Sequence, residues 1–204
     1  VTGGTLALST GTVGGPGLLT VNGATFVFTL GAVPTTLSLT NVTIPAGLTI
    51  PNGQSLTLVN SNFTAAVTNS GTLVIHGGVT LGGALTTGPS SSLRMEGINT
   101  YGAGALTLTS GVTNAALIEL TDVVAGFGAS LTVSGGPLTN GPTGTIIART
   151  GLNGPRTLTA QLDNQGTVTL ERPLTLNGVS AVHTNSGTID ATGGLFTLTQ
   201  SGTA

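Results

Sequence analysis

The sequence predicts an all-β fold in which short strands coil into a parallel β-solenoid. Three observations support this prediction: one strand-like motif recurs along the chain, apolar and polar residues alternate within it with a period of two, and no window shows sustained helical spacing. Recurrence of one motif at a regular spacing is typical of repeat architectures, in which each coil contacts only its neighbours. A sandwich would require longer strands and would not require the motif to recur.

The first strand of each predicted coil begins with a small residue, often Thr, and continues with apolar, outward and apolar positions. The first copy begins at Gly4 and the ninth at Gly187, 183 residues later, which gives coils of about 23 residues. Because stacked strands lie about 4.8 Å apart, about nine coils would form a rod of roughly 43 Å. The nine copies are Gly4–Leu8, Ala24–Phe28, Gly47–Ile50, Gly71–Ile75, Ser92–Met95, Leu117–Leu120, Gly144–Ala148, Gly166–Leu170 and Gly187–Ala191.

A second motif, with the form apolar, Thr, apolar, follows each copy of the first. Its central position is expected to point outward and is Thr or Ser every time, which predicts one column of hydroxyl groups on a sheet face. The column is expected to contain Thr20, Ser38, Thr57, Thr80, Thr107, Thr132, Thr159, Thr175 and Thr197.

A third and weaker segment precedes the first motif and often ends in Asn, as in Val67–Asn69 and Leu138–Asn140. Asn side chains readily hydrogen-bond nearby backbone groups. We therefore expect these residues to stack on one another and to bond the backbone of neighbouring coils.

The composition excludes several classes of function. Only 5% of the residues are charged, with four Arg, no Lys and no Cys, whereas an ordinary domain has about 25% charged residues. Nucleic-acid binding requires a basic surface that this chain lacks. No run of about 20 apolar residues is present, so no membrane insertion is expected. The lack of Cys excludes a disulfide framework and is compatible with an exported protein.

The few charged residues are expected to form surface pairs between neighbouring coils. Exposed pairs of this kind contribute about 0–1 kcal/mol each. The expected pairs are Arg94 with Glu119, His76 with Glu96, and Arg149 with Glu171.

No catalytic, cofactor-binding or metal-binding residues are predicted. The closest non-adjacent acids, Glu119 and Asp122, are expected to diverge, whereas acid–base catalysis requires carboxylates that converge in a cleft. His76 and His183 lack neighbours that could complete a metal site. An enzyme acting on polysaccharides stays open as a third hypothesis, and it would require two loops to bring Asp122 and Arg156 together.

Two segments near the C-terminal end resemble a known family of coils. Leu162–Val168 and Thr184–Asp190 resemble coils of large bacterial surface β-helix proteins, which include filamentous-haemagglutinin-like adhesins and autotransporter passengers. Gly97–Leu108 is similar to the autotransporter-associated strand repeat. The resemblance implies a right-handed parallel β-helix that is exported and exposed at the cell surface. It implies no catalytic residues, because none match.

The leading hypothesis is a non-enzymatic extracellular rod, serving as a stalk, a fibre or a surface-layer element. One solenoid domain is expected over residues 1–204, as a segment of a longer protein or fibre. Neither end shows a capping helix or a charged cap, so we expect the rod to continue or to stack with copies of itself. A nearly neutral surface also gives little electrostatic protection from association.

The second hypothesis is a binding module that uses the predicted column of Thr and Ser. A cell-surface glycan or ice is the expected ligand. High β-propensity on an exposed sheet face, lateral packing against another chain and O-glycosylation are further explanations for the same column.

Overall fold

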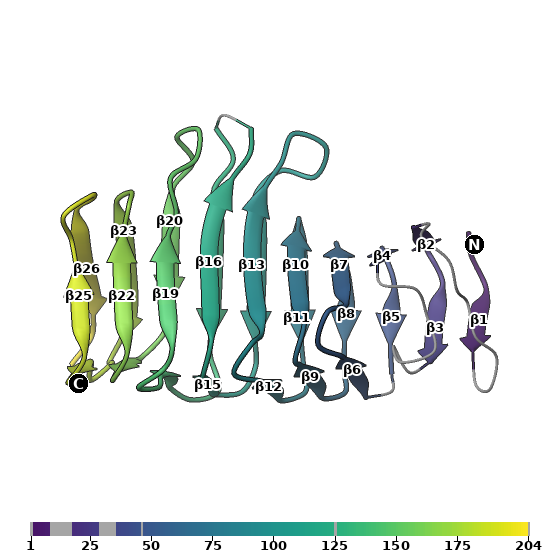
Figure 1. Cartoon of the computed structure of the whole chain (residues 1–204), viewed down its shortest axis with the longest axis horizontal. Helices are drawn as coiled ribbons and strands as arrows, with labels where there is room; N and C mark the ends of the chain where they lie inside the picture. The colour runs from purple at the N-terminus through teal and green to yellow at the C-terminus, as the bar shows by residue number, and fades with distance from the viewer. Residues whose placement is uncertain (1, 9–17, 29–35, 46, 125, 204) are drawn as a thin grey trace.

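The computed structural model describes residues 2–8, 18–28, 36–45, 47–124 and 126–203. Every regular element in these ranges is a β-strand, and parallel pairing joins the strands into four sheets that wind through about eight turns. The strands stand side by side along the long axis of the molecule, from β1 to β26 (Figure 1). The described ranges contain no helix able to span a membrane.

The predicted class, an all-β parallel solenoid, is confirmed. The structure has about eight turns where nine coils were expected, and the expected right-handed sense is not confirmed.

Two long sheets form the sides of the rod. The first sheet contains β2 (Leu19–Asn22), β4 (Thr36–Thr40), β7 (Ser55–Val59), β10 (Thr72–His76), β13 (Ser92–Gly97), β16 (Leu117–Asp122), β19 (Thr145–Ala148), β22 (Thr167–Leu170) and β25 (Thr188–Asp190). The second sheet contains β1 (Thr5–Leu8), β3 (Thr25–Phe28), β5 (Thr43–Ile44), β8 (Asn62–Phe63), β11 (Gly78–Leu81), β14 (Gly104–Leu108), β17 (Ala129–Val133), β20 (Arg156–Thr159), β23 (Leu174–Val179) and β26 (Phe196–Ser201).

Two short sheets form the corner at which each coil leaves the second sheet and enters the first. One contains β6 (Leu48–Ile50), β9 (Val67–Asn69) and β12 (Leu85–Thr87). The other contains β15 (Val112–Asn114), β18 (Leu138–Asn140), β21 (Leu162–Asn164) and β24 (Thr184–Asn185).

Aliphatic side chains fill the interior in columns that run along the axis. Successive side chains of a strand point to opposite faces, so the alternating motif places every second residue inside. One column follows the first sheet, and each member of it is at most 1% exposed. It consists of Leu37, Leu56, Leu73, Leu93, Ile118, Ile146 and Val168.

A column of buried amides runs through the corner. Asn114 donates a hydrogen bond to Asn140 over 2.8 Å, Asn140 donates to Asn164 over 2.7 Å, and Asn164 donates to Asn185 over 2.6 Å. Each of the three donors also bonds a backbone carbonyl of the adjacent coil. The expectation that the Asn residues stack and bond neighbouring coils is therefore confirmed.

The same corner explains the glycine that precedes many first-sheet strands. A Cβ atom at Gly166 would overlap the carbonyl oxygen of Gly144, and one at Gly187 would overlap that of Gly166. Adjacent coils lie too close at this corner to admit a side chain.

Coil length varies along the rod. Leu56 pairs with Leu73, which closes a coil of 17 residues, whereas Ile118 pairs with Ile146 and closes one of 28. The longer coils carry loops after β13, β16 and β19 that project from one end of the sheets (Figure 1).

This variation makes part of the predicted register wrong. Gly4–Leu8 and Ala24–Phe28 lie in the second sheet and Gly47–Ile50 lies in a corner sheet, whereas the copies from Gly71 onward lie in the first sheet as expected. Both long sheets use the same alternation of apolar and polar residues. A uniform spacing of 23 residues therefore assigned the shorter N-terminal coils to the wrong side.

Replacing Asn140 with Ala should destabilise the fold. The change leaves partners of a buried amide unsatisfied, so we expect the free energy of unfolding to fall by about 1–3 kcal/mol in chemical denaturation. The matched control is Asn62→Ala, at an exposed position of β8, which should change stability by no more than about 0.5 kcal/mol. Equal effects of the two substitutions would contradict the structural role of the amide column.

Candidate functional site

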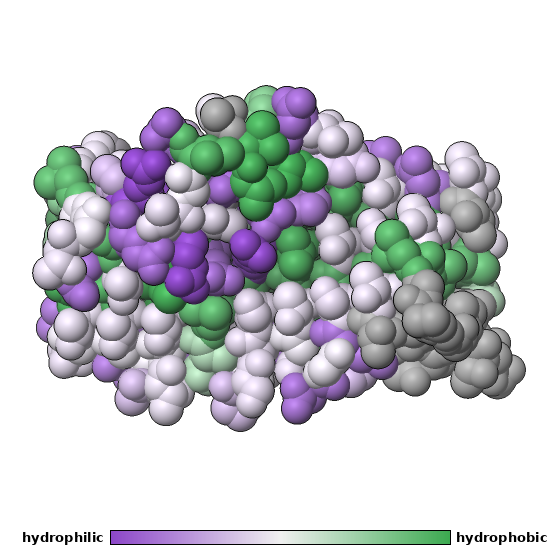
Figure 2. Space-filling view, turned by 45° about the horizontal axis from the view of Figure 1, so that its top comes forward, coloured by the Kyte–Doolittle hydropathy of each residue, from purple (hydrophilic) through white to green (hydrophobic). Residues whose placement is uncertain are grey.

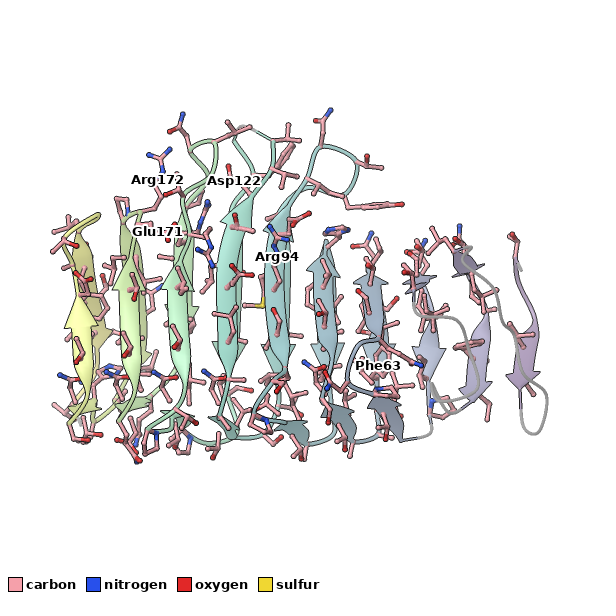
Figure 3. The ribbon with its side chains drawn as sticks, in the orientation of Figure 1. Phe63, Arg94, Asp122, Glu171 and Arg172 are labelled. Atoms are coloured by element: carbon pink, nitrogen blue, oxygen red, sulfur yellow. The ribbon has the colours of Figure 1, made fainter. Side chains whose placement is uncertain are left out.

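Charged side chains concentrate toward the end of the coils from which the long loops project. Arg94, Asp122, Glu171 and Arg172 all lie in this part of the molecule (Figure 3). Figure 2 shows apolar side chains gathered beside strongly polar ones over the same region. The first question is therefore whether these charges form a reactive site.

The first charged cluster surrounds Glu96. Nε2 of His76 lies 3.2 Å from one carboxylate oxygen of Glu96, and Nε of Arg94 lies 3.0 Å from the other. The hydrogen bond with His76 lowers the pKa of Glu96, burial opposes this shift, and the positive charge of Arg94 adds to it. The His76 ring also stacks on Tyr101, with the ring centroids 6.2 Å apart. The expected pair between His76 and Glu96 is confirmed.

The second cluster is a bridge centred on Arg149, which directly follows β19. Its guanidinium donates to Glu119 over 2.7 Å and to Glu171 over 3.1 Å, because β19 lies between the strands that carry or precede these acids. The hydrogen bond with Glu119 raises the pKa of Arg149 against the opposing effect of burial. The expected pair between Arg149 and Glu171 is confirmed.

The expected pair between Arg94 and Glu119 is wrong. The two residues are in register on neighbouring strands, but Arg94 pairs with Glu96 of its own strand and Glu119 pairs with Arg149. Sequence register identified the neighbours without showing which acid each guanidinium reaches.

The third cluster is a buried pair between Asp122 and Arg156. Both side chains are 0% exposed, and the Asp122 carboxylate accepts hydrogen bonds from the guanidinium and from the backbone amides of Leu152, Asn153 and Gly154. Burial raises the pKa of Asp122, but the bonds from Arg156 and the backbone outweigh it and leave the pKa lowered. The pair anchors the loop after β19.

This geometry gives Asp122 and Arg156 a structural role. The loops do bring Asp122 and Arg156 together, as the enzymatic hypothesis required, and the carboxylate accepts hydrogen bonds from the loop after β19 and is closed to solvent. Glu119 is directed instead toward Arg149 on the outer face, so the two acids diverge as expected.

The remaining charged groups also bond within the chain. Asp163 bonds Thr184 and Gln165, Asp190 bonds Thr192, and Arg172 donates to the loop after β19. Among the described residues, no group of three or more His, Asp or Glu is placed to hold a metal ion.

The most regular outer surface lies on the second sheet. One outward position carries Thr or Asn on all ten strands, and we name this set the Thr column. Its members, joined by strand register, are Thr5, Thr25, Thr43, Asn62, Thr80, Thr107, Thr132, Thr159, Asn177 and Thr199.

The structure divides the nine predicted column residues into three groups. Thr80, Thr107, Thr132 and Thr159 lie in the Thr column. A second group lies on the first sheet and consists of Thr20, Ser38 and Thr57. The third group lies in the adjacent outward position of the second sheet, in register with Ser130 and Thr157, and consists of Thr175 and Thr197.

Sequence reasoning missed six members of the Thr column for two reasons. The uniform spacing assigned the N-terminal coils to the wrong sheet, which excluded Thr5, Thr25, Thr43 and Asn62. Leu174, Thr175 and Leu176 match the expected motif, but strand pairing aligns Asn177 with Thr159. The motif identifies an outward hydroxyl without showing which of two outward positions it occupies. The pattern Thr157-Leu158-Thr159, with hydroxyls at both positions, was the available signal that two parallel columns are present.

A groove of about 360 Å³ opens where β17, β20 and β23 leave the second sheet, and it includes Thr132, Thr159 and Asn177 of the Thr column. It exists because the middle coil is shorter at this corner. Five residues lie between Thr132 and Leu138, but only two lie between Thr159 and Leu162, the positions paired with them in the next coil. The coil on the other side is long again, since four residues connect β23 to β24.

The family models, curated proteins and solved structures with which the chain was compared provide no match.

Replacing Asp122 with Asn should destabilise the protein at neutral pH by about 3–5 kcal/mol, because it leaves the Arg156 guanidinium buried without a counter-charge. Limited proteolysis within residues 150–155 should accelerate at the same time, since the loop loses its anchor. The control is Asp163→Asn on the exposed surface, which we expect to have little effect on either measurement. Unchanged stability of the Asp122 variant would contradict the anchoring role.

The same pair predicts a dependence of stability on pH. The pKa of Asp122 is lower in the folded state than its ordinary value of 3.8, so the folded state binds this proton less readily than the unfolded state does. The stabilisation is therefore complete above pH 3.8 and lost as the pH falls through the folded-state pKa. Acid titration followed by circular dichroism should show a shallower loss of stability in Asp122→Asn than in the parent protein.

Proposed function

We propose that this chain is a non-enzymatic structural and adhesive rod, exposed outside the cell at a bacterial surface. The observation that carries the proposal is the continuous stacking of coils along one axis, with an aliphatic column and an amide column inside. In such an array every coil is held by its neighbours, so length can increase without a new core design. Rigid extension is the property that a stalk or fibre requires.

The use of the charged residues supports the same proposal. All four Arg and all six acids bond within the chain, and the buried ion pair of Asp122 with Arg156 anchors a loop. These groups therefore stabilise the scaffold and are not arranged around a cleft. We place the rod at the bacterial surface because Leu162–Val168 and Thr184–Asp190 resemble coils of surface adhesins and autotransporter passengers.

We infer that a second copy of the chain is the partner that covers the open edges. Among the described strands, β24, β25 and β26 end their sheets, and the last coil leaves apolar side chains in solvent. Leu195 is 67% exposed and Leu198 is 52% exposed. An unpaired strand edge beside exposed apolar groups is a template for further pairing. Parallel strands edge the described sheets at both ends, and edges of this kind favour further pairing along the axis.

The Thr column supports a second candidate function, that of a binding module for a glycan or for ice. From β17 to β26 two outward positions of the second sheet carry mostly hydroxyl groups, which gives two parallel ranks. The ranks are Ser130, Thr157, Thr175 and Thr197 beside Thr132, Thr159, Asn177 and Thr199. A rod that displays such a face could act as an adhesin.

Electron microscopy and light scattering of the purified protein should show filaments that lengthen with protein concentration. A charge at the open edge should prevent this growth, so Leu195→Lys is expected to give short monomeric rods. The matched control is Thr68→Lys, which places the same charge at an exposed position in the middle strand of a corner sheet and should leave assembly intact. A parent protein that stays monodisperse at high concentration would exclude self-assembly.

A further inference from the structure

We propose that the groove between β17, β20 and β23 is a binding site for a neutral polysaccharide. This inference rests on the adhesive part of the proposed function and names the ligand class and the place where it binds. The floor is the short middle coil, with Thr159, Ala160 and Gln161. The longer coils on either side form the walls. A volume of about 360 Å³ falls within the range of roughly 300–1,000 Å³ that is usual for small-molecule sites.

The groove gathers hydrogen-bonding groups that the fold leaves unused. The side chains of Thr132, Thr159, Gln161 and Asn177 line it, and none of them has a hydrogen-bond partner among the described residues. Elsewhere the buried amides of the corner and the charged groups are bonded within the chain. Hydroxyl and amide side chains both donate and accept hydrogen bonds, as the hydroxyl groups of a sugar do.

Apolar surface lies beside these polar groups. Val179 is 77% exposed on one wall, and Pro137 lies on the opposite wall. A sugar ring combines hydroxyl groups at its rim with apolar C–H faces, so it can use both kinds of surface at once. A groove that mixes a few polar groups with apolar walls is the usual form of a small-molecule site.

The groove contains no ionisable side chain. Its lining consists of Thr, Ser, Asn, Gln, Gly, Pro, Ala and Val. Anionic ligands such as phosphates or nucleic acids would lose hydration there without gaining a cation. Because no cation would offset the lost hydration of an anion, the groove favours an uncharged ligand.

The backbone of the groove is not available to a peptide strand. β20 pairs with β17 on one side and with β23 on the other, so its ladder groups are already used. Addition of a peptide as a further strand requires a free edge. Recognition must therefore come from the side chains, which suits a sugar chain.

The concave shape of the groove favours a polysaccharide over ice as the ligand. The Thr column is open along the sheet, but at Thr159 the surface sinks between two longer coils. A flat crystal face could contact the walls without reaching the floor, whereas a flexible polysaccharide can enter. The site is also without an aromatic platform, so we expect millimolar affinity for each groove, equivalent to about −4 kcal/mol. Several rods in one assembly would raise the effective affinity by avidity.

The test measures binding to dextran, mannan, arabinogalactan and xyloglucan by affinity electrophoresis, with anionic alginate in parallel. The parent protein should be retarded by at least one neutral polysaccharide. The double substitution Thr159→Val and Gln161→Leu keeps the size of the two side chains but removes their hydrogen-bonding groups from the floor, so it should weaken binding by about tenfold or more. The matched control is Thr80→Val, in the same Thr column but outside the groove, which should change affinity by less than about twofold.

Four results would overturn the proposal: no retardation by any neutral polysaccharide, stronger retardation by alginate, unchanged binding of the double variant, or equal loss in Thr80→Val. Light scattering of each variant measures self-assembly separately from polysaccharide binding. A double variant that loses binding and still assembles supports both proposals, and an assembling protein that binds no polysaccharide removes the groove site alone. Circular dichroism confirms that each variant remains folded.

Discussion

The interaction on which the rest of the structure depends is parallel pairing between consecutive coils. Because each strand pairs with the equivalent strand of the next coil, residues with the same role fall in columns. Leu and Ile columns then exclude water from the interior, and the Asn114, Asn140 and Asn164 amides satisfy one another at the corner. No single coil could bury these groups alone, so stability belongs to the stack.

Charge has a structural use in this protein. The clusters that contain Arg94, Glu171 and Asp122 lie toward the end from which the long loops project (Figure 3). Asp122 accepts three loop amides, and Arg156 and Arg172 donate to loop carbonyls. Outside these clusters the charged side chains are Asp163, Arg172 and Asp190, and each of them bonds within the chain.

Differences in coil length create the local features of an otherwise uniform rod. Added residues after β13, β16 and β19 produce projecting loops, and missing residues after Thr159 produce the groove. Neither change disturbs strand pairing, because the insertions and deletions fall at turns. A solenoid can therefore acquire a site at one coil while its neighbours preserve the scaffold.

Local sequence patterns are sufficient to predict the class of fold, the apolar interior and the amide column. Alternation with a period of two and the Asn that ends segments such as Leu138–Asn140 are local signals, and they predicted the buried positions and the stacking of the amides. Only the tertiary structure decided which sheet each motif enters, that Asn177 continues the Thr column, and that Asp122 meets Arg156 across 34 residues. The physical reason is that register and ion pairing depend on the length of every coil between the partners. The same motif occurs on both sheets, so it carries no information about coil length.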